Sequence, residues 1–126
     1  MAVLIFDSGA LIALERAERT ISTTLTAAIA DEVEVITSSA CIAQVWRDPA
    51  RQVRLTRALG GLRERPLDGE HARRCGLLLA RSGAGDVVDA AVATLARDGD
   101  TILTSDPEGI AHLLAAAGTS AKVRAV

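Results

Sequence analysis

Short apolar runs recur along the chain at the spacing of strands in a layered fold. Residues 2–6 (AVLIF) form a continuous apolar run, which is typical of a central parallel strand covered on both faces. Residues 33–37 and 101–103 repeat a short strand pattern, and residues 63–67 are a further short candidate. Residues 122–126 alternate between polar and apolar, as an edge strand does. The pattern predicts four to five strands spread over the whole chain.

Helical periodicity fills the intervals between these strands. Apolar residues three and four positions apart predict helices after each strand candidate. The helices are expected to begin at or near Ser8, Ile21, Ser38, Pro49, Asp68, Asp86 and Pro107. Alternating strands and helices indicate an α/β fold with a mainly parallel sheet. At 126 residues the chain is expected to form one domain, residues 1–126.

Aspartates stand where the predicted strands end and the predicted helices begin. Asp7 directly follows the first apolar run, and Asp106 follows the strand at residues 101–103. Asp86 and Asp89 lie three residues apart at the start of a helix, so they occupy neighbouring positions on one face. Because open α/β sheets place ligands at the carboxyl ends of their strands, we expect these four acids to meet there.

Each of these aspartates also has a purely structural explanation. Asp7, Asp86 and Asp106 suit the N-cap position of a helix, and Asp89 suits the third helical residue. A cap is satisfied locally, whereas two aspartates at the ends of strands in one sheet can face each other. The repetition of this placement at both ends of the chain favours a functional site.

Carboxylates at close range need a counter-charge, because they cannot all be ionised without one. Oxygen ligands without histidine or cysteine favour Mg²⁺ or Mn²⁺. Such an ion binds phosphate oxygens and lowers the pKa of a bound water, so phosphodiester hydrolysis is the natural reaction. The sequence contains no nucleophilic serine elbow and no glycine-rich phosphate loop, which leaves metal-activated water as the nucleophile.

The formal net charge of −2 gives no overall attraction to nucleic acid, but the charges are unevenly distributed. Nine arginines lie between Arg47 and Arg81, against four acids. Within this basic segment Arg47, Arg51 and Arg54 repeat at intervals of four and three, which predicts that they line one side of a helical segment. They are candidates for contacts with an RNA backbone, with a solvated surface as the alternative.

The remaining polar residues suggest no second site. Cys41 and Cys75 fall in apolar helical patterns without metal-site spacing, so they are expected to be reduced core thiols. His71 and His112 have no polar partner nearby in sequence and are expected at the surface. No apolar run approaches the roughly 18 residues of a membrane span, and we expect a cytoplasmic protein without a membrane partner.

Four segments resemble the PIN-domain ribonucleases, and most closely the VapC toxins of bacterial type II toxin–antitoxin pairs. They are VLIFDSGALIAL, TSSACIAQVWRD, GDVVDAAVATLA and TILTSDPEGIAHL, in the family's order and spacing. The resemblance implies a PIN-like three-layer α/β/α fold with a central sheet of four to five strands. It also implies metal-dependent endonuclease activity on RNA, dimerisation, and inhibition by a cognate antitoxin protein.

The same resemblance assigns roles to individual residues. Asp7, Asp89 and Asp106 match the family's catalytic, metal-binding acids, and Asp86 resembles an accessory metal ligand one turn earlier. A hydroxyl that supports such sites corresponds to Thr104 or Ser105.

One position departs from the family's pattern. The family usually carries a glutamate on the middle helix where this chain has Gln44. Glutamine can still ligate through its carbonyl oxygen or hold a water, but it brings no charge. The substitution weakens metal binding, or leaves Asp86 to compensate for the missing charge, or marks a divergent branch of the family.

Two other classes compete with a nuclease. A PIN-like module that binds RNA or protein without cutting is favoured by Gln44. An aspartate-phosphorylating α/β domain would need an acid pair near the first strand or an Asp-x-Asp motif, whereas Asp7 is followed by Ser8 and Gly9.

Overall fold

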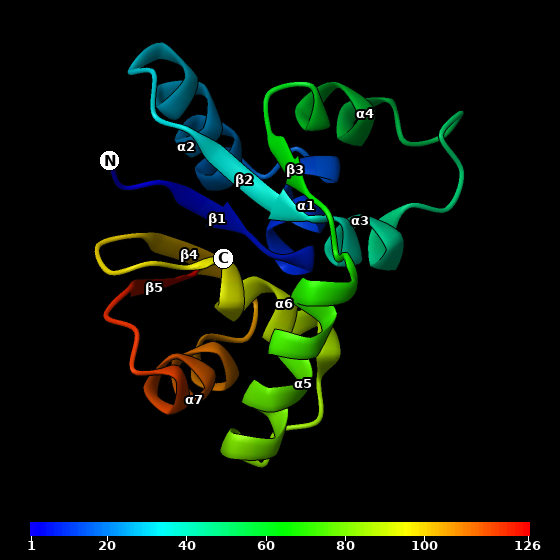
Figure 1. The fold of residues 1–126 in the computed structure, drawn as a ribbon. Coiled ribbons are helices and arrows are strands. Elements are labelled where there is room, and N and C mark those ends of the chain that lie inside the picture. Colours follow the sequence, from blue (N-terminus) through cyan, green and yellow to red (C-terminus); the bar gives the residue numbers. More distant parts are fainter.

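The apolar run at the start of the chain forms the central strand of a five-stranded sheet. In the computed structural model, which describes residues 1–126, all neighbouring strands are parallel and the order is β3-β2-β1-β4-β5 (Figure 1). The strands are β1 (Leu4–Phe6), β2 (Val35–Ser38), β3 (Arg63–Arg65), β4 (Thr101–Thr104) and β5 (Lys122–Ala125). Ile5 and Phe6 of β1 are fully buried, because helices cover both faces of the sheet at its centre.

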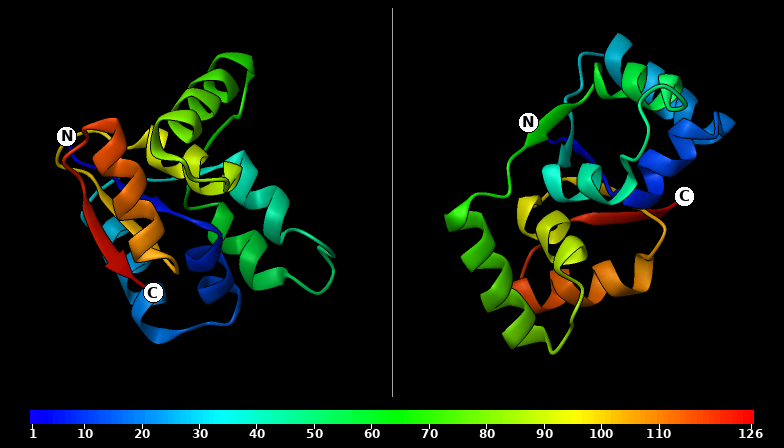
Figure 2. Two further views of the ribbon diagram at one scale, coloured as in Figure 1. Left: turned by 90° about the horizontal axis from the view of Figure 1, so that it is seen from below. Right: turned by 90° about the vertical axis from the view of Figure 1, so that its right-hand side faces the viewer.

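The helices form one layer on each face of the sheet (Figure 2). Right-handed crossovers toward β3 place α1 (Ser8–Glu15), α2 (Arg19–Ala30) and α4 (Val53–Leu59) on one face. The return crossovers place α5 (Gly69–Ser82), α6 (Val87–Leu95) and α7 (Pro107–Ala117) on the other. The short helix α3 (Ser39–Val45) contacts both α1 and α6. The predicted three-layer α/β/α fold is confirmed, and its sheet is entirely parallel.

The helix expected to begin near Pro49 begins later in the structure. Helix α3 ends at Val45 and α4 begins only at Val53, so Arg47 and Arg51 lie in the connecting loop. Gln52, a buried residue, holds this loop together. Its amide nitrogen donates to the Val45 carbonyl at 2.8 Å, and its carbonyl oxygen accepts from the backbone N–H groups of residues 47 and 48 at 2.9 and 3.0 Å.

The prediction that His71 lies at the surface is also wrong. His71 is buried at the start of α5, where Nδ1 lies 3.3 Å from the Pro66 carbonyl oxygen and Nε2 lies against the Thr94 hydroxyl at 2.5 Å. Since Thr94 belongs to α6, this contact joins two consecutive helices through residues 23 positions apart. His112 is exposed as predicted, and its Nε2 lies 2.7 Å from the Ser82 carbonyl oxygen.

The expectation of buried, reduced cysteines is met. Cys41 and Cys75 are free thiols, and both are buried. No helix combines the length and apolarity needed to cross a bilayer.

Candidate active site

Three of the four aspartates cap helices, and they do so with one oxygen each. The Oδ1 atoms of Asp7, Asp86 and Asp106 accept from the N–H of the residue three positions later, at 2.9, 3.0 and 3.1 Å. Capping fixes the side chain at the start of α1, α6 or α7. The second carboxylate oxygen stays available for another partner. The structural and the functional explanations of these residues are therefore compatible.

Asp7 is the innermost acid of the group. It follows β1, is 3 % exposed, and its Oδ2 accepts from the Ser105 N–H at 3.3 Å. Burial raises the pKa of Asp7, while hydrogen bonds from the Thr104 hydroxyl and from nearby backbone N–H groups oppose that rise. Because β1 and β4 are neighbours in the sheet, these contacts join the end of one strand to the end of the next.

Glycine makes this close approach possible at two places. A Cβ atom on Gly9 would clash with Ser105, and a Cβ atom on Gly109 would clash with the Asp106 carboxylate. Gly9 therefore lets the start of α1 lie against the end of β4, and Gly109 leaves room for the carboxylate that caps α7.

Asp89 brings the remaining acids together. It lies in the first turn of α6, is half-buried, and its carboxyl group is hydrogen-bonded to that of Asp106. Burial, followed by the negative charge of Asp86 and the contact with Asp106, raises the pKa of Asp89 to about 7, with a smaller contribution from Asp7. The structure thus gathers the four predicted aspartates into one electrostatically linked cluster, which becomes more exposed from Asp7 toward Asp86 and Asp106.

The donor set of this cluster fits a hard divalent cation. All of its ligating atoms are carboxylate oxygens, and their mutual repulsion is the kind that a cation relieves. No three acidic, histidine or cysteine side chains surround a common point at metal-binding distance. A proton shared by two carboxyl groups removes repulsion in the same way as a metal ion, so the two alternatives compete for the same oxygens.

The supporting residues occupy different places. Thr104 is fully buried, contacts Asp7, and accepts from the Asp106 N–H through Oγ1 at 2.8 Å. Ser105 reaches Asp7 through its backbone N–H, while its side chain is exposed. Gln44 is exposed on α3 and forms no hydrogen bond with the acids. Of the three candidates, Thr104 is the one whose hydroxyl connects two acids.

Cys41 contributes a neutral wall to the cluster, which sequence reasoning did not predict. Its thiol is fully buried beside Ser8, and burial together with the charge of Asp7 raises its pKa to about 11. The thiol therefore stays protonated near neutral pH and does not act as a thiolate ligand.

The three candidate arginines are exposed around the loop between α3 and α4. The Arg47 guanidinium donates to the carbonyl oxygens of Ala43 and Trp46, and Arg51 forms an exposed ion pair with Asp48 at 3.6 Å. Such an exposed pair contributes little to stability, so both partners can exchange it for another contact. Arg54 has no ion-pair partner.

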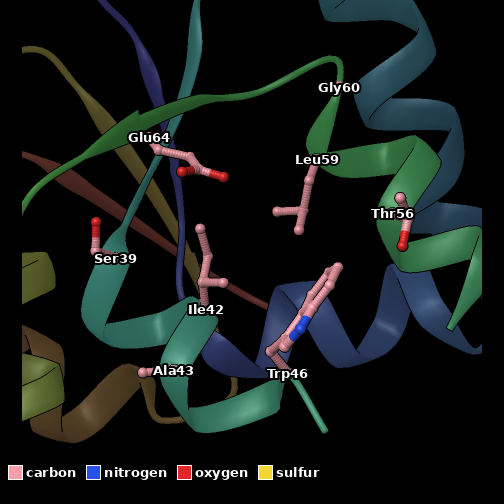
Figure 3. A pocket seen from close by; sticks show the side chains of 8 residues that line it. All are labelled: Ser39, Ile42, Ala43, Trp46, Thr56, Leu59, Gly60 and Glu64. Atoms are coloured by element: carbon pink, nitrogen blue, oxygen red, sulfur yellow. The ribbon is translucent and has the colours of Figure 1, made fainter. Parts of the chain in front are cut away.

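An apolar groove beside this loop was not predicted from the sequence. It has a volume of about 620 Å³ and lies between α3, α4 and β3. Ile42, Trp46 and Leu59 point toward one another across it, and Glu64 lies at its rim (Figure 3). The residues converge only through tertiary packing, since they are spread over the α3–α4 hairpin and β3.

The three-layer arrangement around an entirely parallel sheet is the PIN-like fold expected from the sequence. Solved structures share the fold over nearly their whole length. One is the structure of VapBC2 from Rickettsia felis bound to a DNA fragment from the VapBC2 promoter. A chain of that complex has a TM-score of 0.71 at 12 % identity, with 97 % of this chain and 98 % of that chain covered.

Two further solved structures are similar. A chain of DNA-bound VapBC from Salmonella typhimurium has a TM-score of 0.65 at 14 % identity, with 98 % of each chain covered. A chain of FitAcB from Neisseria gonorrhoeae has a TM-score of 0.61 at 14 % identity, with 95 % and 96 % covered. No family model matches the sequence, and no curated protein matches it significantly. The resemblance to VapC-type PIN domains is thus confirmed at the level of the fold.

Proposed function

We propose that this protein is a metal-dependent endoribonuclease that acts as the toxin of a toxin–antitoxin pair. The observation that carries the proposal is the cluster of Asp7, Asp89 and Asp106 at the carboxyl edge of the sheet, with Asp86 beside it. Mutual repulsion in this cluster, expressed in the raised pKa of Asp89, supports a site for Mg²⁺ or Mn²⁺. The similarity to chains of VapBC and FitAB complexes supports a toxin role and a protein partner.

In this proposal each residue has a defined task. The carboxylates of Asp7, Asp89 and Asp106 would hold the cation. Thr104 contacts Asp7 and accepts from the Asp106 N–H, so it fixes these two acids relative to each other. The bound ion would neutralise charge on the phosphodiester and lower the pKa of a water nucleophile. Asp86 adds negative charge at the exposed rim of the cluster. The exposed arginines Arg47, Arg51 and Arg54 are proposed to contact RNA phosphates.

The direct test is cleavage of single-stranded RNA by the purified protein. We expect cleavage with added Mn²⁺ or Mg²⁺, complete loss in excess chelator, and recovery when the metal is returned in excess. Full activity in chelator would contradict the proposal. Binding of RNA without cleavage at any metal concentration would instead identify a PIN-like binding module.

Changing Gln44 to glutamate is expected to tighten Mn²⁺ binding about tenfold, which corresponds to about 1.4 kcal/mol. Gln44 lies on α3, three residues after Cys41, whose thiol is adjacent to Asp7. An added carboxylate there increases the negative charge at the cluster, and hard-cation sites adjust affinity through the number of charged ligands. Titration calorimetry measures the change.

The matched control for this variant is Ala43→Glu. Ala43 is the neighbouring residue on α3, is also exposed, and lines the apolar groove on the α4 side. Equal effects of the two variants would show a general charge effect, and no effect of Gln44→Glu would place Gln44 outside the metal site.

We further propose that the groove between α3 and α4 binds an apolar segment of the antitoxin. Its walls are Ile42, Trp46 and Leu59, which together offer an apolar surface to an apolar segment of a partner (Figure 3). Exchange of the exposed Arg51–Asp48 pair for a partner carboxylate would bring the two proteins together at this loop.

Leu59→Lys is expected to weaken antitoxin binding at least tenfold. Where a small reading frame lies directly upstream of the coding sequence, the polypeptide that it encodes is the probe. Trp46, the single tryptophan, reports groove occupancy by its fluorescence. Leu77→Lys is the control, because Leu77 is 68 % exposed on α5, away from the groove. A loss of binding in Leu77→Lys but not in Leu59→Lys would place the interface on α5 instead.

The family resemblance also leads us to propose a homodimer. Light scattering of the purified protein alone measures its mass in solution and so tests this proposal.

A further inference from the structure

A polar cavity lies at the edge of the sheet opposite to the aspartates. Its lining includes Val3, Glu34 and Asp100, each directly before a strand, and the residues that end α6. Since the strands are parallel, these positions mark the amino edge. The cavity has a volume of about 520 Å³, which lies within the usual range of small-molecule sites.

The acids that line this cavity are already engaged. Asp100 is buried and accepts from the backbone N–H groups of Val3 and Arg97, both at 2.9 Å. Asp98 accepts from the Ser120 N–H at 2.8 Å. Glu34 pairs with Arg65 at 3.0 Å through the same oxygen that lies 3.6 Å from a second arginine of β3. The negative charges of the cavity are therefore bound to the protein's own donors.

Two of the cations have no such partner. The Arg74 guanidinium makes one hydrogen bond, to the Thr94 carbonyl oxygen at 3.0 Å, and pairs with no carboxylate. The Arg97 side chain makes neither a hydrogen bond nor an ion pair, although its backbone is fixed by Asp100. Arg74 comes from α5 and Arg97 from the residues after α6, so two guanidinium groups from separate segments line one cavity with unused donors.

We propose that this cavity binds a small phosphate-bearing ligand of nucleotide size. A guanidinium group presents its N–H donors in a planar fork that matches phosphate oxygens, and Arg74 and Arg97 supply two. Val3, Ile36 and Leu95 line the same cavity with apolar surface, which suits the flat, weakly polar base of a nucleotide. The pairing of cationic and apolar walls distinguishes this ligand from a bare inorganic anion.

The site is independent of the proposed nuclease activity. It lies at the carboxyl end of α6, whereas Asp86 and Asp89 lie at the beginning of that helix. At a rise of about 1.5 Å per residue, the ten positions from Asp86 to Ala96 separate the two ends by roughly 15 Å. A ligand at Arg74 and Arg97 therefore does not touch the aspartates.

The experiment measures binding of adenosine monophosphate (AMP) and of adenosine by calorimetry, at low ionic strength and in excess chelator so that no metal mediates binding. We expect AMP to bind at least tenfold more tightly than adenosine. Arg97→Ala is expected to weaken AMP binding at least tenfold without affecting the fold, because the side chain is exposed and makes no hydrogen bond or ion pair within the protein. Asp7→Asn is expected to bind AMP as the native protein does, which separates this site from the acidic cluster.

Arg19→Ala is the control, since Arg19 is an exposed arginine on α2, on the other face of the sheet. Equal losses in Arg19→Ala and Arg97→Ala would reduce the effect to general charge and overturn the proposal. So would equal binding of AMP and adenosine, or an unchanged affinity in Arg97→Ala.

Discussion

Asp7→Asn is expected to reduce RNA cleavage at least about a thousandfold, a loss of about 4 kcal/mol in transition-state stabilisation. The substitution removes the one acid of the cluster that is 3 % exposed and that contacts β4 through both Thr104 and Ser105. Asparagine keeps the oxygen that accepts from the Ala10 N–H, so the N-cap of α1 survives. The loss therefore reports on the charge of Asp7 and not on the fold.

The control is another N-cap aspartate that lies outside the cluster. Asp68 caps α5 by accepting from the His71 N–H at 2.8 Å, in the same manner as Asp7 caps α1. Asp68→Asn is expected to cleave RNA at the native rate. Native cleavage by well-folded Asp7→Asn protein would exclude the cluster as the active site, and equal loss in both variants would attribute the effect to capping.

Asp89→Asn is expected to stabilise the metal-free protein by about 2 kcal/mol at pH 8, with little change near pH 4. The pKa of Asp89 is raised from 3.8 to about 7 in the folded state by burial and by its acidic neighbours. Each unit of such a shift corresponds to about 1.4 kcal/mol, and solvent screening of this half-buried group reduces the total.

The direction of the pH dependence follows from proton binding. Between pH 3.8 and about 7 the folded protein holds a proton on Asp89 that the unfolded chain has lost. Stability therefore falls as the pH rises through this window and levels off above it. Asp89→Asn removes the dependence, because the amide does not titrate.

Urea unfolding at a series of pH values in chelator measures this difference. Mn²⁺ is expected to stabilise the native protein at pH 8 more than at pH 5, because the cation and the proton compete for the same carboxylates. A native protein whose stability does not change between pH 5 and 8 would contradict the crowding of Asp89 with Asp86 and Asp106.

The sequence predicted those features of the fold whose signals are local. The apolar run before Asp7 predicts a central strand, because burial on both faces leaves no polar position in it. The caps Asp68, Asp86 and Asp106 predict helix starts, because the capping hydrogen bond spans three residues. The prediction that the four acids lie at one edge of the sheet followed from its parallel topology. In a parallel sheet the carboxyl ends of all strands lie at the same edge.

Features that depend on distant partners could not be read in the same way. His71 is buried because Thr94 of α6 offers a hydroxyl, and no local pattern announces that contact. The helix expected to begin near Pro49 begins only at Val53, because Gln52 binds the backbone of the loop before it. The groove at Trp46 and the cavity at Arg97 each combine side chains from several elements, so only the tertiary structure defines them.

The placement of β1 between β2 and β4 sets when the cluster of acids can form during synthesis. Asp7 is made before its Oδ2 partner Ser105, which follows it by 98 residues. At roughly 5–20 residues per second, a ribosome needs on the order of 5–20 s to make that stretch. Parallel pairing over such a separation adds a slow search after synthesis. A nascent chain therefore carries Asp7 for the whole of this interval before the end of β4 arrives beside it.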